Sequence, residues 1–419
     1  MKKIIAIAGL MFCGFVYSQN FGSVTGNIES TFKYLQDDPS IGALVPEQKA
    51  AINSYALINY SLGKFRAGVR IESYLPSLPG YPDRFDGTGL GYRYVGYYSD
   101  KLEVTLGNFY GQFGSGMLFR SYEQRSLGID NAMDGIKLLY KPYKGIALQG
   151  VYGRMRFSLN SGKIIKGEGI VRGLDGEIDF AQMFPKMLEK KFQFSVGGSF
   201  VSKYQGGTHP EYILPKNVGS YAARARFGYE NFFIDAEYAH KENDPSLDNK
   251  YIYNSGHGMI INTGYSMKGL GILFSMKSVD NMSFRSERER ILTDLNVNFL
   301  PTLSKNHSHN LAATLYPYTT QPLGEVALQG DVIYTVPKKS KLGGKYGMKI
   351  SLNFSTAYAP IQSLTGVNPS DSSRVTYKGK LFDKSNKKYF QDFNVNITRK
   401  FNKHFKMGIT YYNLQLNND

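Results

Sequence analysis

The sequence contains no tryptophan and only one cysteine, and this scarcity of cysteine limits the chemistry open to the protein. Cys13 lies in the apolar N-terminal stretch, so removal of that stretch leaves no thiol for disulfide or thiolate chemistry. Beyond residue 18 no apolar run approaches the roughly 20 residues that a membrane-spanning helix needs. Such a chain can cross a membrane only as a closed β-sheet, because lipid offers no hydrogen-bond partners to an unpaired backbone.

The first eighteen residues have the layout of a secretory signal peptide. Lys2 and Lys3 form a basic start, Ile4–Val16 forms the apolar centre, and Ser18 precedes a cleavage site before Gln19. The apolar centre is too short to span a membrane. The sequence therefore predicts export, with residues 1–18 as the signal peptide and residues 19–419 as one domain.

Apolar and polar side chains alternate along many short segments, as where Val24, Ile28 and Phe32 alternate with Asn27 and Glu29. A period of two is typical of strands that have one face on lipid and the other on water. About eighteen such segments follow one another, with short turns and long loops in alternation, as in transmembrane barrels. The sequence thus predicts an all-β, antiparallel transmembrane β-barrel with short periplasmic turns and long external loops.

Turn and loop positions follow from the same pattern. Short turns are expected at Gly63-Lys64, Glu230-Asn231 and Lys268-Gly269. Long loops are expected at Gln36–Gln48, Leu75–Gly91, Asn108–Gly135, Asp280–Leu323 and Ala359–Lys388. The polar end of the chain, Gln415–Asp419, lacks the terminal aromatic residue of outer-membrane barrels, and we interpret this as a truncation.

The chain is basic, with 50 Lys and Arg against 34 Asp and Glu, a formal charge of +16. The positive charge is scattered through strands and loops rather than gathered in one patch, which argues against a nucleic-acid partner. Two interpretations remain open. The excess charge contacts the phosphate-rich outer leaflet, or it makes the lumen favour anions.

Basic residues on the polar face of the predicted strands are candidates for the lumen wall: Arg66, Arg70, Arg224, Arg226 and Lys349. A two-residue turn at Glu230-Asn231 sets Arg226 opposite Asp235 and Arg224 opposite Glu237. An arginine near the lipid midplane costs about 2–4 kcal/mol, whereas paired charges in a wet lumen are tolerated. The two pairs favour assigning this face to the lumen, although solvated charges that oppose by chance would give the same pattern.

The segment Asn108–Gly135 is too polar and too rich in glycine for a strand and too long for a turn. Its polar residues are Arg120, Tyr122, Glu123, Arg125, Asp130, Asn131 and Asp134. One interpretation is a loop that folds into the lumen and selects solutes by charge. The other is a structural plug whose charges pair with one another and with the wall.

No enzymatic or cofactor signature accompanies these features. The run Gly111–Gly116 lacks a phosphate-loop lysine, and the spacing of Asp130, Asn131 and Asp134 misses the calcium-binding loop. The serines near His307 and His309 have no nucleophile motif around them. We therefore expect no enzyme, metal or cofactor.

Four stretches together resemble an uncharacterised family of outer-membrane barrel proteins from Bacteroidota: GNFYGQFGSGMLFRSYEQRSLGIDNAMDG, GEGIVRGLDGEIDF, GGSFVSKY and TLYPYTTQPLGEVALQGDVIYTVPKKS. The resemblance spans most of the predicted mature chain. It implies an outer-membrane barrel without a settled activity, and its members usually continue beyond the end of this sequence.

The expected function is a porin-like channel for small solutes with a partly basic lumen. The alternative is a non-conducting outer-membrane scaffold or accessory subunit of a secretion or assembly machine. The partners expected for either are outer-membrane lipid and lipopolysaccharide, the barrel-assembly machinery during biogenesis, and surface or secretion partners. Active transport through an energised plug is not expected, because the first predicted strand follows directly on the signal peptide.

Overall fold

The computed structural model describes residues 21–45, 47–307, 314, 317–367 and 375–417. The predicted signal peptide, residues 1–18, lies outside the described residues. Seventeen strands form one sheet in which each strand pairs antiparallel with the next along the wall. The prediction of an all-β, antiparallel fold is confirmed, with one strand fewer than the expected eighteen or so.

The wall strands of the first half are β1 (Ser23–Tyr34), β2 (Ala50–Leu62), β3 (Phe65–Tyr74), β4 (Gly87–Tyr98), β5 (Leu102–Phe109), β10 (Met133–Tyr140), β11 (Ile146–Asn160), β12 (Lys163–Asp179) and β13 (Phe192–Tyr204). Those of the second half are β14 (Asn217–Tyr229), β15 (Phe232–Lys241), β16 (Gly256–Met267), β17 (Leu270–Asp280), β18 (Gly324–Val336), β19 (Met348–Val367), β20 (Val375–Lys400) and β21 (Lys406–Leu416). Two short helices, α2 (Phe180–Met183) and α3 (Lys186–Glu189), join β12 to β13.

Short and long connections alternate along most of the sheet, as predicted, but not strictly. The turns at Gly63-Lys64, Glu230-Asn231 and Lys268-Gly269 lie between consecutive strands at one end. Gly63 has a φ of +56°, which an L residue rarely adopts. The connections at the other end, such as those between β3 and β4 and between β17 and β18, are long. We call these the turn end and the loop end. At the loop end Ser161-Gly162 joins β11 to β12 in a short turn, because both strands extend into the expected loop, and at the turn end Pro337–Gly347 joins β18 to β19 in a longer one.

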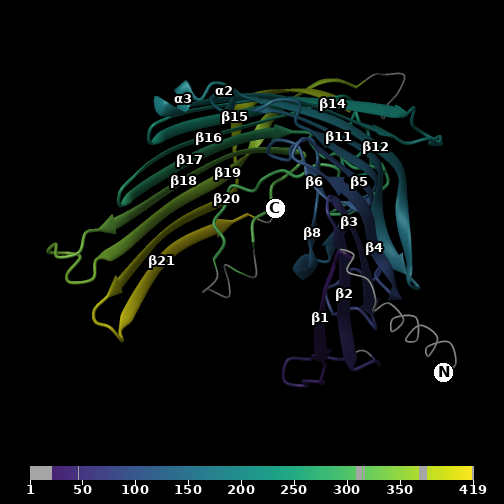
Figure 1. Cartoon of the computed structure of the whole chain (residues 1–419), viewed down its shortest axis with the longest axis horizontal. Coiled ribbons are helices and arrows are strands. Elements are labelled where there is room, and N and C mark those ends of the chain that lie inside the picture. Colours follow the sequence, from purple (N-terminus) through teal and green to yellow (C-terminus); the bar gives the residue numbers. More distant parts are fainter. Residues whose placement is uncertain (1–20, 46, 308–313, 315–316, 368–374, 418–419) are drawn as a thin grey trace.

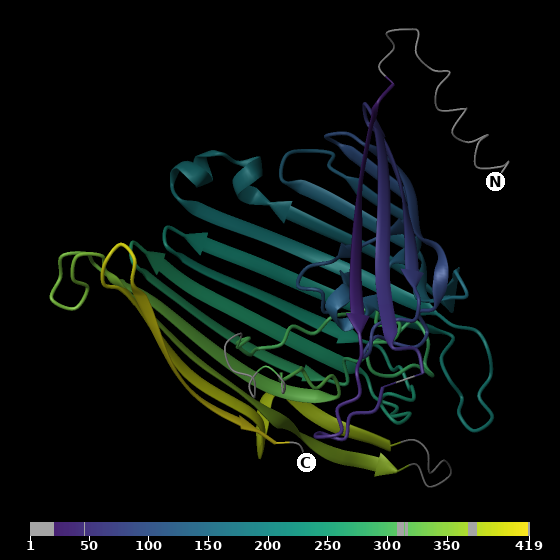
Figure 2. The same cartoon turned by 90° about the horizontal axis from the view of Figure 1, so that it is seen from below.

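The sheet curls into a deep trough with β1 and β21 at its two edges (Figures 1 and 2). Within the described residues, β1 pairs only with β2 and β21 only with β20. The expected loop at Ala359–Lys388 is wrong in extent, because β19 and β20 run into it from both sides. Tyr377 and Gln362 on these extensions donate to Asp280, which ties the hairpin to β17 and keeps it extended.

The two faces of the sheet differ in chemistry. Convex-facing side chains are mostly apolar and exposed, and along β10 they are Ile136, Leu138 and Tyr140. On the concave face of β19 they are polar, with Lys349, Ser351 and Asn353. The alternation predicted from the sequence therefore places apolar side chains on the convex face and polar side chains on the concave face. In the part of the chain that the structure describes, no helix has the length and apolar character needed to cross a membrane.

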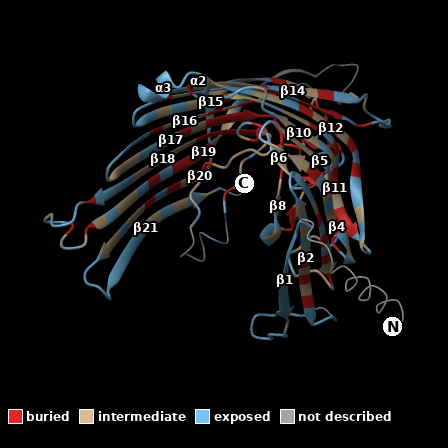
Figure 3. Cartoon of the chain, viewed as in Figure 1, coloured by how far each residue is buried: buried red, intermediate tan, exposed pale blue. Residues whose placement is uncertain are grey.

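The concave face is not polar throughout, and here the expectation of a wet inner wall is wrong in part. Valines and alanines of β11 to β17 are buried beneath inward-folded segments (Figure 3). This apolar core includes Val151, Val171, Val201, Ala239 and Val279. These side chains are apolar because they contact the inward-folded segments and not water.

Candidate functional site: the segments inside the trough

Two segments that leave the wall at its loop end occupy the trough. The first inner segment, Tyr110–Ala132, leaves at Phe109 and returns at Met133, and these two residues lie directly opposite in the register of β5 and β10. It contains two small hairpins and a 3-10 turn: β6 (Gly111–Gln112) with β7 (Arg120–Ser121), β8 (Glu123–Gln124) with β9 (Ile129–Asp130), and η1 (Arg125–Leu127). The second inner segment, Asn281–His307, lies between β17 and β18.

Apolar side chains hold the first inner segment against the wall. Phe113, Met117, Leu118 and Phe119 are at most 1% exposed. They pack against the buried valines and alanines of the concave face in one cluster. Fully burying a side chain of this size contributes about 1.5–3 kcal/mol. The segment is therefore a fixed part of the core.

A buried network of ion pairs ties the same segment to β3 and β11. Asp130 Oδ2 lies 2.8 Å from Arg70 Nη2 and 2.7 Å from Arg156 Nη1. Glu72 joins both guanidinium groups, at 2.7 Å from Arg70 and 2.6 Å from Arg156. Glu123 adds a contact of 3.1 Å to Arg70. The carboxylates of the segment thus compensate arginines of the wall.

The edge of the network reaches β1 and the start of the segment. Arg125 Nη1 lies 2.6 Å from Glu29 Oε2 on β1 and its Nε lies 3.0 Å from Glu123. The Tyr110 hydroxyl donates to Asp130 Oδ1 at 3.0 Å. Burial, and then the nearby Asp130 carboxylate, raise the pKa of Tyr110 well above its usual value, so that it remains a donor at any physiological pH.

The two inner segments also bind each other. Arg120 N donates to Val297 O at 2.8 Å, and Asn131 Nδ2 donates to Asn296 O at 2.9 Å. The Arg120 guanidinium lies 4.1 Å from the ring centre of Phe299. Arg120 and Asn131, which we expected at a constriction, therefore lie at the contact between the two segments.

The predicted register between β14 and β15 is confirmed, with Arg224 opposite Glu237 and Arg226 opposite Asp235. The expected ion pairs across it are wrong. Arg224 reaches across β13 to Asp175 at 2.7 Å and Glu177 at 3.0 Å. Gly197 lies in its path and has no side chain to block it.

Glu237 instead forms a hydrogen bond with the first inner segment. Its Oε2 accepts the backbone N–H of Ser115 at 2.7 Å. Gly114, at a φ of +49°, faces this carboxylate so closely that a Cβ would lie 2.4 Å from the same oxygen. Arg226 lies over the Phe233 ring at 5.5 Å, and Asp235 accepts from Asn262 at 2.9 Å.

Lys349 belongs to a second feature, at the turn end of the trough. Four lysines line a cavity of about 430 Å³ between β18 and β21: Lys338, Lys349, Lys400 and Lys406. Its other lining residues are neutral and include Tyr346, Ser351 and Thr398. Lys400 and Lys406 lie directly opposite in register, a like-charge pair that is unfavourable without an anion. We call this cavity the lysine groove.

The candidate residues therefore lie in several separate places rather than in one site. Arg70, Glu123, Arg125 and Asp130 meet in the buried network, and Lys349 lies in the lysine groove. Arg66 lies apart from both, over the ring of Tyr98 at 4.9 Å. Sequence analysis named neither Arg156 nor Glu72 as a site candidate, although Glu72 continues the polar row of Arg66 and Arg70 on β3.

The structure places three residues that were weighed for metal or hydrolytic chemistry: Asp130, Asp134 and His307. Asp130 faces the trough, whereas Asp134 follows the convex-facing row of β10, so the two carboxylates cannot share an ion. No group of three or more His, Cys, Asp or Glu side chains suited to a metal occurs in the described ranges. His307 Nε2 lies 2.7 Å from Asp392 Oδ2, while Ser308 and His309 lie outside the described residues.

Solved structures similar to this chain are outer-membrane proteins. OccK8 (OprE) of Pseudomonas aeruginosa is 7% identical with a TM-score of 0.45, covering 94% of this chain and 93% of its own. OprD of Pseudomonas aeruginosa is 10% identical with a TM-score of 0.41, covering 94% and 87%. Salmonella typhi OmpF, solved with daunomycin, is 12% identical with a TM-score of 0.40, covering 95% and 99%. Likeness at this level assigns no function.

No curated protein matches the sequence. A family model described as a family of unknown function (DUF6029) matches residues 1–419. The chain therefore belongs to the DUF6029 family.

Proposed function

We propose that this protein is a porin-like channel of the bacterial outer membrane that admits small anionic solutes. The observation that carries the proposal is the lysine groove, which places four ammonium groups and no carboxylate on the lining of one cavity. Rings and clusters of like charge select ions of the opposite sign in pores. The cleaved signal peptide expected from residues 1–18 and the apolar convex face support the same location.

The inner segments set where a solute can pass. They cover the concave face of β11 to β17 with buried apolar side chains, and Leu303 packs with Ala327, Ala357 and Phe390 over the loop-end part of β18 to β20. Nearer the turn end, Asn396 and Thr398 of β20 stay partly exposed toward the trough. We propose that the conducting path runs along β18 to β21 and reaches the lysine groove at the turn end. With the path placed there, the charged residues of the buried network hold the first inner segment in position and do not contact the solute.

Single-channel recording in planar bilayers tests this function. The full chain is expected to give steady steps with anion preference. Lys349→Gln combined with Lys400→Gln removes two of the four charges and should shift the reversal potential in a salt gradient toward cations. Lys268→Gln is the matched control, because it removes one lysine charge from a turn at the same end but outside the groove.

A non-conducting scaffold is the second candidate, and the burial of the first inner segment inside the trough favours it. Phe113, Met117, Leu118 and Phe119 of the first inner segment are buried as completely as a protein core. In the buried network the side chains of Arg156 and Asp130 are 0% and 7% exposed. A correctly folded chain that never conducts would favour the scaffold. In that case co-purification of defined partners from native membranes, including the assembly machinery, becomes the deciding measurement.

A further inference from the structure

A group of charged side chains projects from the convex face, where the function proposed above makes no use of them. Asp134 Oδ2 lies 3.4 Å from Arg93 Nη2 and 3.1 Å from Lys166 Nζ. Arg154 lies opposite Asp134 in the register of β10 and β11, and within the described chain no carboxylate lies within 4.0 Å of it. Three cations therefore surround one carboxylate. We call them the convex cluster.

The position of the convex cluster on the wall follows from the strand register. Asp134 is two residues from Ile136 on β10, and Arg154 is two residues from Tyr152 on β11, so all four face the same way. The row next to the cluster toward the turn end is Val95, Leu106, Ile136 and Tyr152. The row after it contains Tyr97, Val104 and Leu138. The cluster thus borders the apolar band at its loop end.

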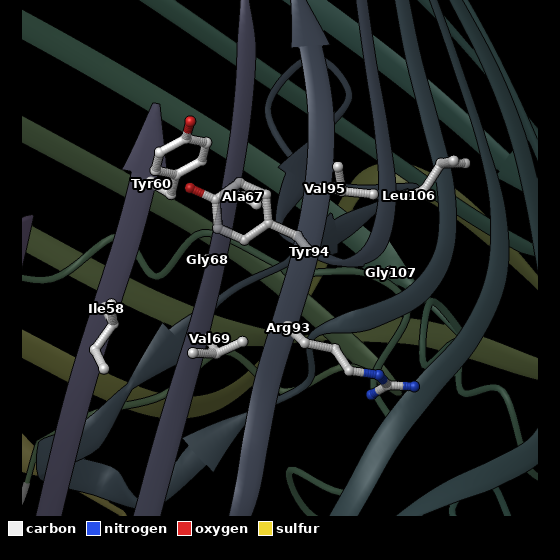
Figure 4. A pocket seen from close by; sticks show the side chains of 10 residues that line it. All are labelled: Ile58, Tyr60, Ala67, Gly68, Val69, Arg93, Tyr94, Val95, Leu106 and Gly107. Carbon is white, nitrogen blue, oxygen red and sulfur yellow. The ribbon is translucent and has the colours of Figure 1, made fainter. Parts of the chain in front are cut away.

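Beside the cluster a groove of about 490 Å³ runs over the outside of β2 to β5. Apolar side chains form most of its lining, among them Ile58, Val69, Val95 and Leu106, and the small Ala67 also lines it (Figure 4). Arg93 lines the same groove and extends from β4 beyond the apolar side chains (Figure 4). An apolar groove with a cation at its end matches a molecule with a hydrocarbon chain and an anionic head.

We propose that the convex cluster and this groove bind one lipid A molecule, with its phosphate on Arg93, Arg154 and Lys166 and an acyl chain in the groove. The inference rests on the membrane location proposed above, because only then is the convex face in contact with lipid. Charge complementarity supports the occupant: the cluster carries three positive charges against one, and arginine binds phosphate oxygens with two parallel hydrogen bonds. The loop end is the external end in barrels of this layout, where a phosphate-rich leaflet lies.

Asp134 has a definite part in the site. Its side chain is 10% exposed, and it holds Arg93 and Lys166 near each other through one shared oxygen. A phosphate that approaches the cluster replaces water on the outer sides of these two cations and on Arg154. The carboxylate is therefore a positioning group, and the cations supply the donors.

Native mass spectrometry of the purified full chain, titrated with lipid A, tests the proposal. Arg93→Gln combined with Lys166→Gln should weaken lipid A binding by about tenfold or more, since hydrogen bonds to charged groups contribute at least this much. Arg226→Gln is the matched control for lipid binding, because it removes one guanidinium from the concave face. Dephosphorylated lipid A should bind wild type and the double variant alike.

Several outcomes would overturn the proposal. Equal lipid A affinity of wild type and the double variant would show that the cluster does not bind the head. Displacement of lipid A by inorganic phosphate at equal concentration would assign the cluster to free phosphate instead. Failure of the folded chain to insert into vesicles would remove the membrane location, whereas insertion without phosphate-dependent binding would remove only the lipid site. Heat-modifiable migration on gels shows in each case that the variant is folded.

Discussion

At the scale of single residues, the sequence indicated which side chains are charged and inward-facing but not which of them meet. Period two placed Arg70, Arg224 and Glu237 on the concave face, and the turn at Glu230-Asn231 set the register of Arg224 and Glu237. The partners could not be predicted, because Arg224 passes over Gly197 to a strand two positions away. The partner of a long side chain depends on the free space around it, and a single sequence does not show that space.

Asp130 is the residue on which the buried network depends. One of its oxygens is shared by Arg70 and Arg156, whose side chains are 5% and 0% exposed. Asp130→Asn keeps the shape but leaves two buried guanidinium groups short of an anion, which should cost about 3–5 kcal/mol of unfolding free energy. A shift of the urea midpoint of unfolding to lower concentration measures this loss. Asp100→Asn, in an exposed turn, should leave the midpoint unchanged, and an equal shift in both variants would contradict the structural role of the network.

At the scale of elements, strand and turn positions were largely predictable, and the inner segments were not. Turn residues and apolar alternation act locally, so that Gly63-Lys64 and Lys268-Gly269 could be placed from sequence. The path of Asn281–His307 depends on contacts with the first inner segment and with β12, far away in the chain. The strand extensions into Ala359–Lys388 depend on Asp280 in the same way.

Gly169 on β12 provides a test of how the second inner segment is held. A Cβ at this position would lie 2.0 Å from the backbone oxygen of Ser286, which has no flexible end to move aside. Gly169→Ala should displace the segment at a cost of about 1–3 kcal/mol, typical of overpacking. Arg288, 3% exposed, should then become open to trypsin in the folded chain. Gly330→Ala, where a Cβ meets nothing within 4 Å, is the control and should stay uncut.

At the scale of the whole molecule, the strands of the wall and the two inner segments depend on different features of the sequence. The wall needs only the alternation that runs through all seventeen strands, and this is why the fold class could be read from the sequence. The inner segments depend on the contacts of their charges and apolar side chains. The polar density of the first inner segment left a constriction and a plug both open, with the plug somewhat favoured, and the burial of Phe113 and Met117 supports the plug.

Replacement of the first inner segment tests the separation directly. Phe109 and Met133 lie opposite each other in register, so an Asn-Gly turn in place of Tyr110–Ala132 can close the hairpin of β5 and β10 without moving either strand. The matched control shortens the connection 35–49 in the same manner, because Tyr34 and Ala50 are also directly opposite. If the segment is a plug, its removal should enlarge single-channel steps several-fold, while the control keeps the wild-type size. Equal step sizes would mean that the second inner segment alone blocks the trough. Loss of the buried side chains should also lower stability, by about 1.5–3 kcal/mol for each of the large ones, so both variants need to be compared at a temperature where each migrates as a folded protein.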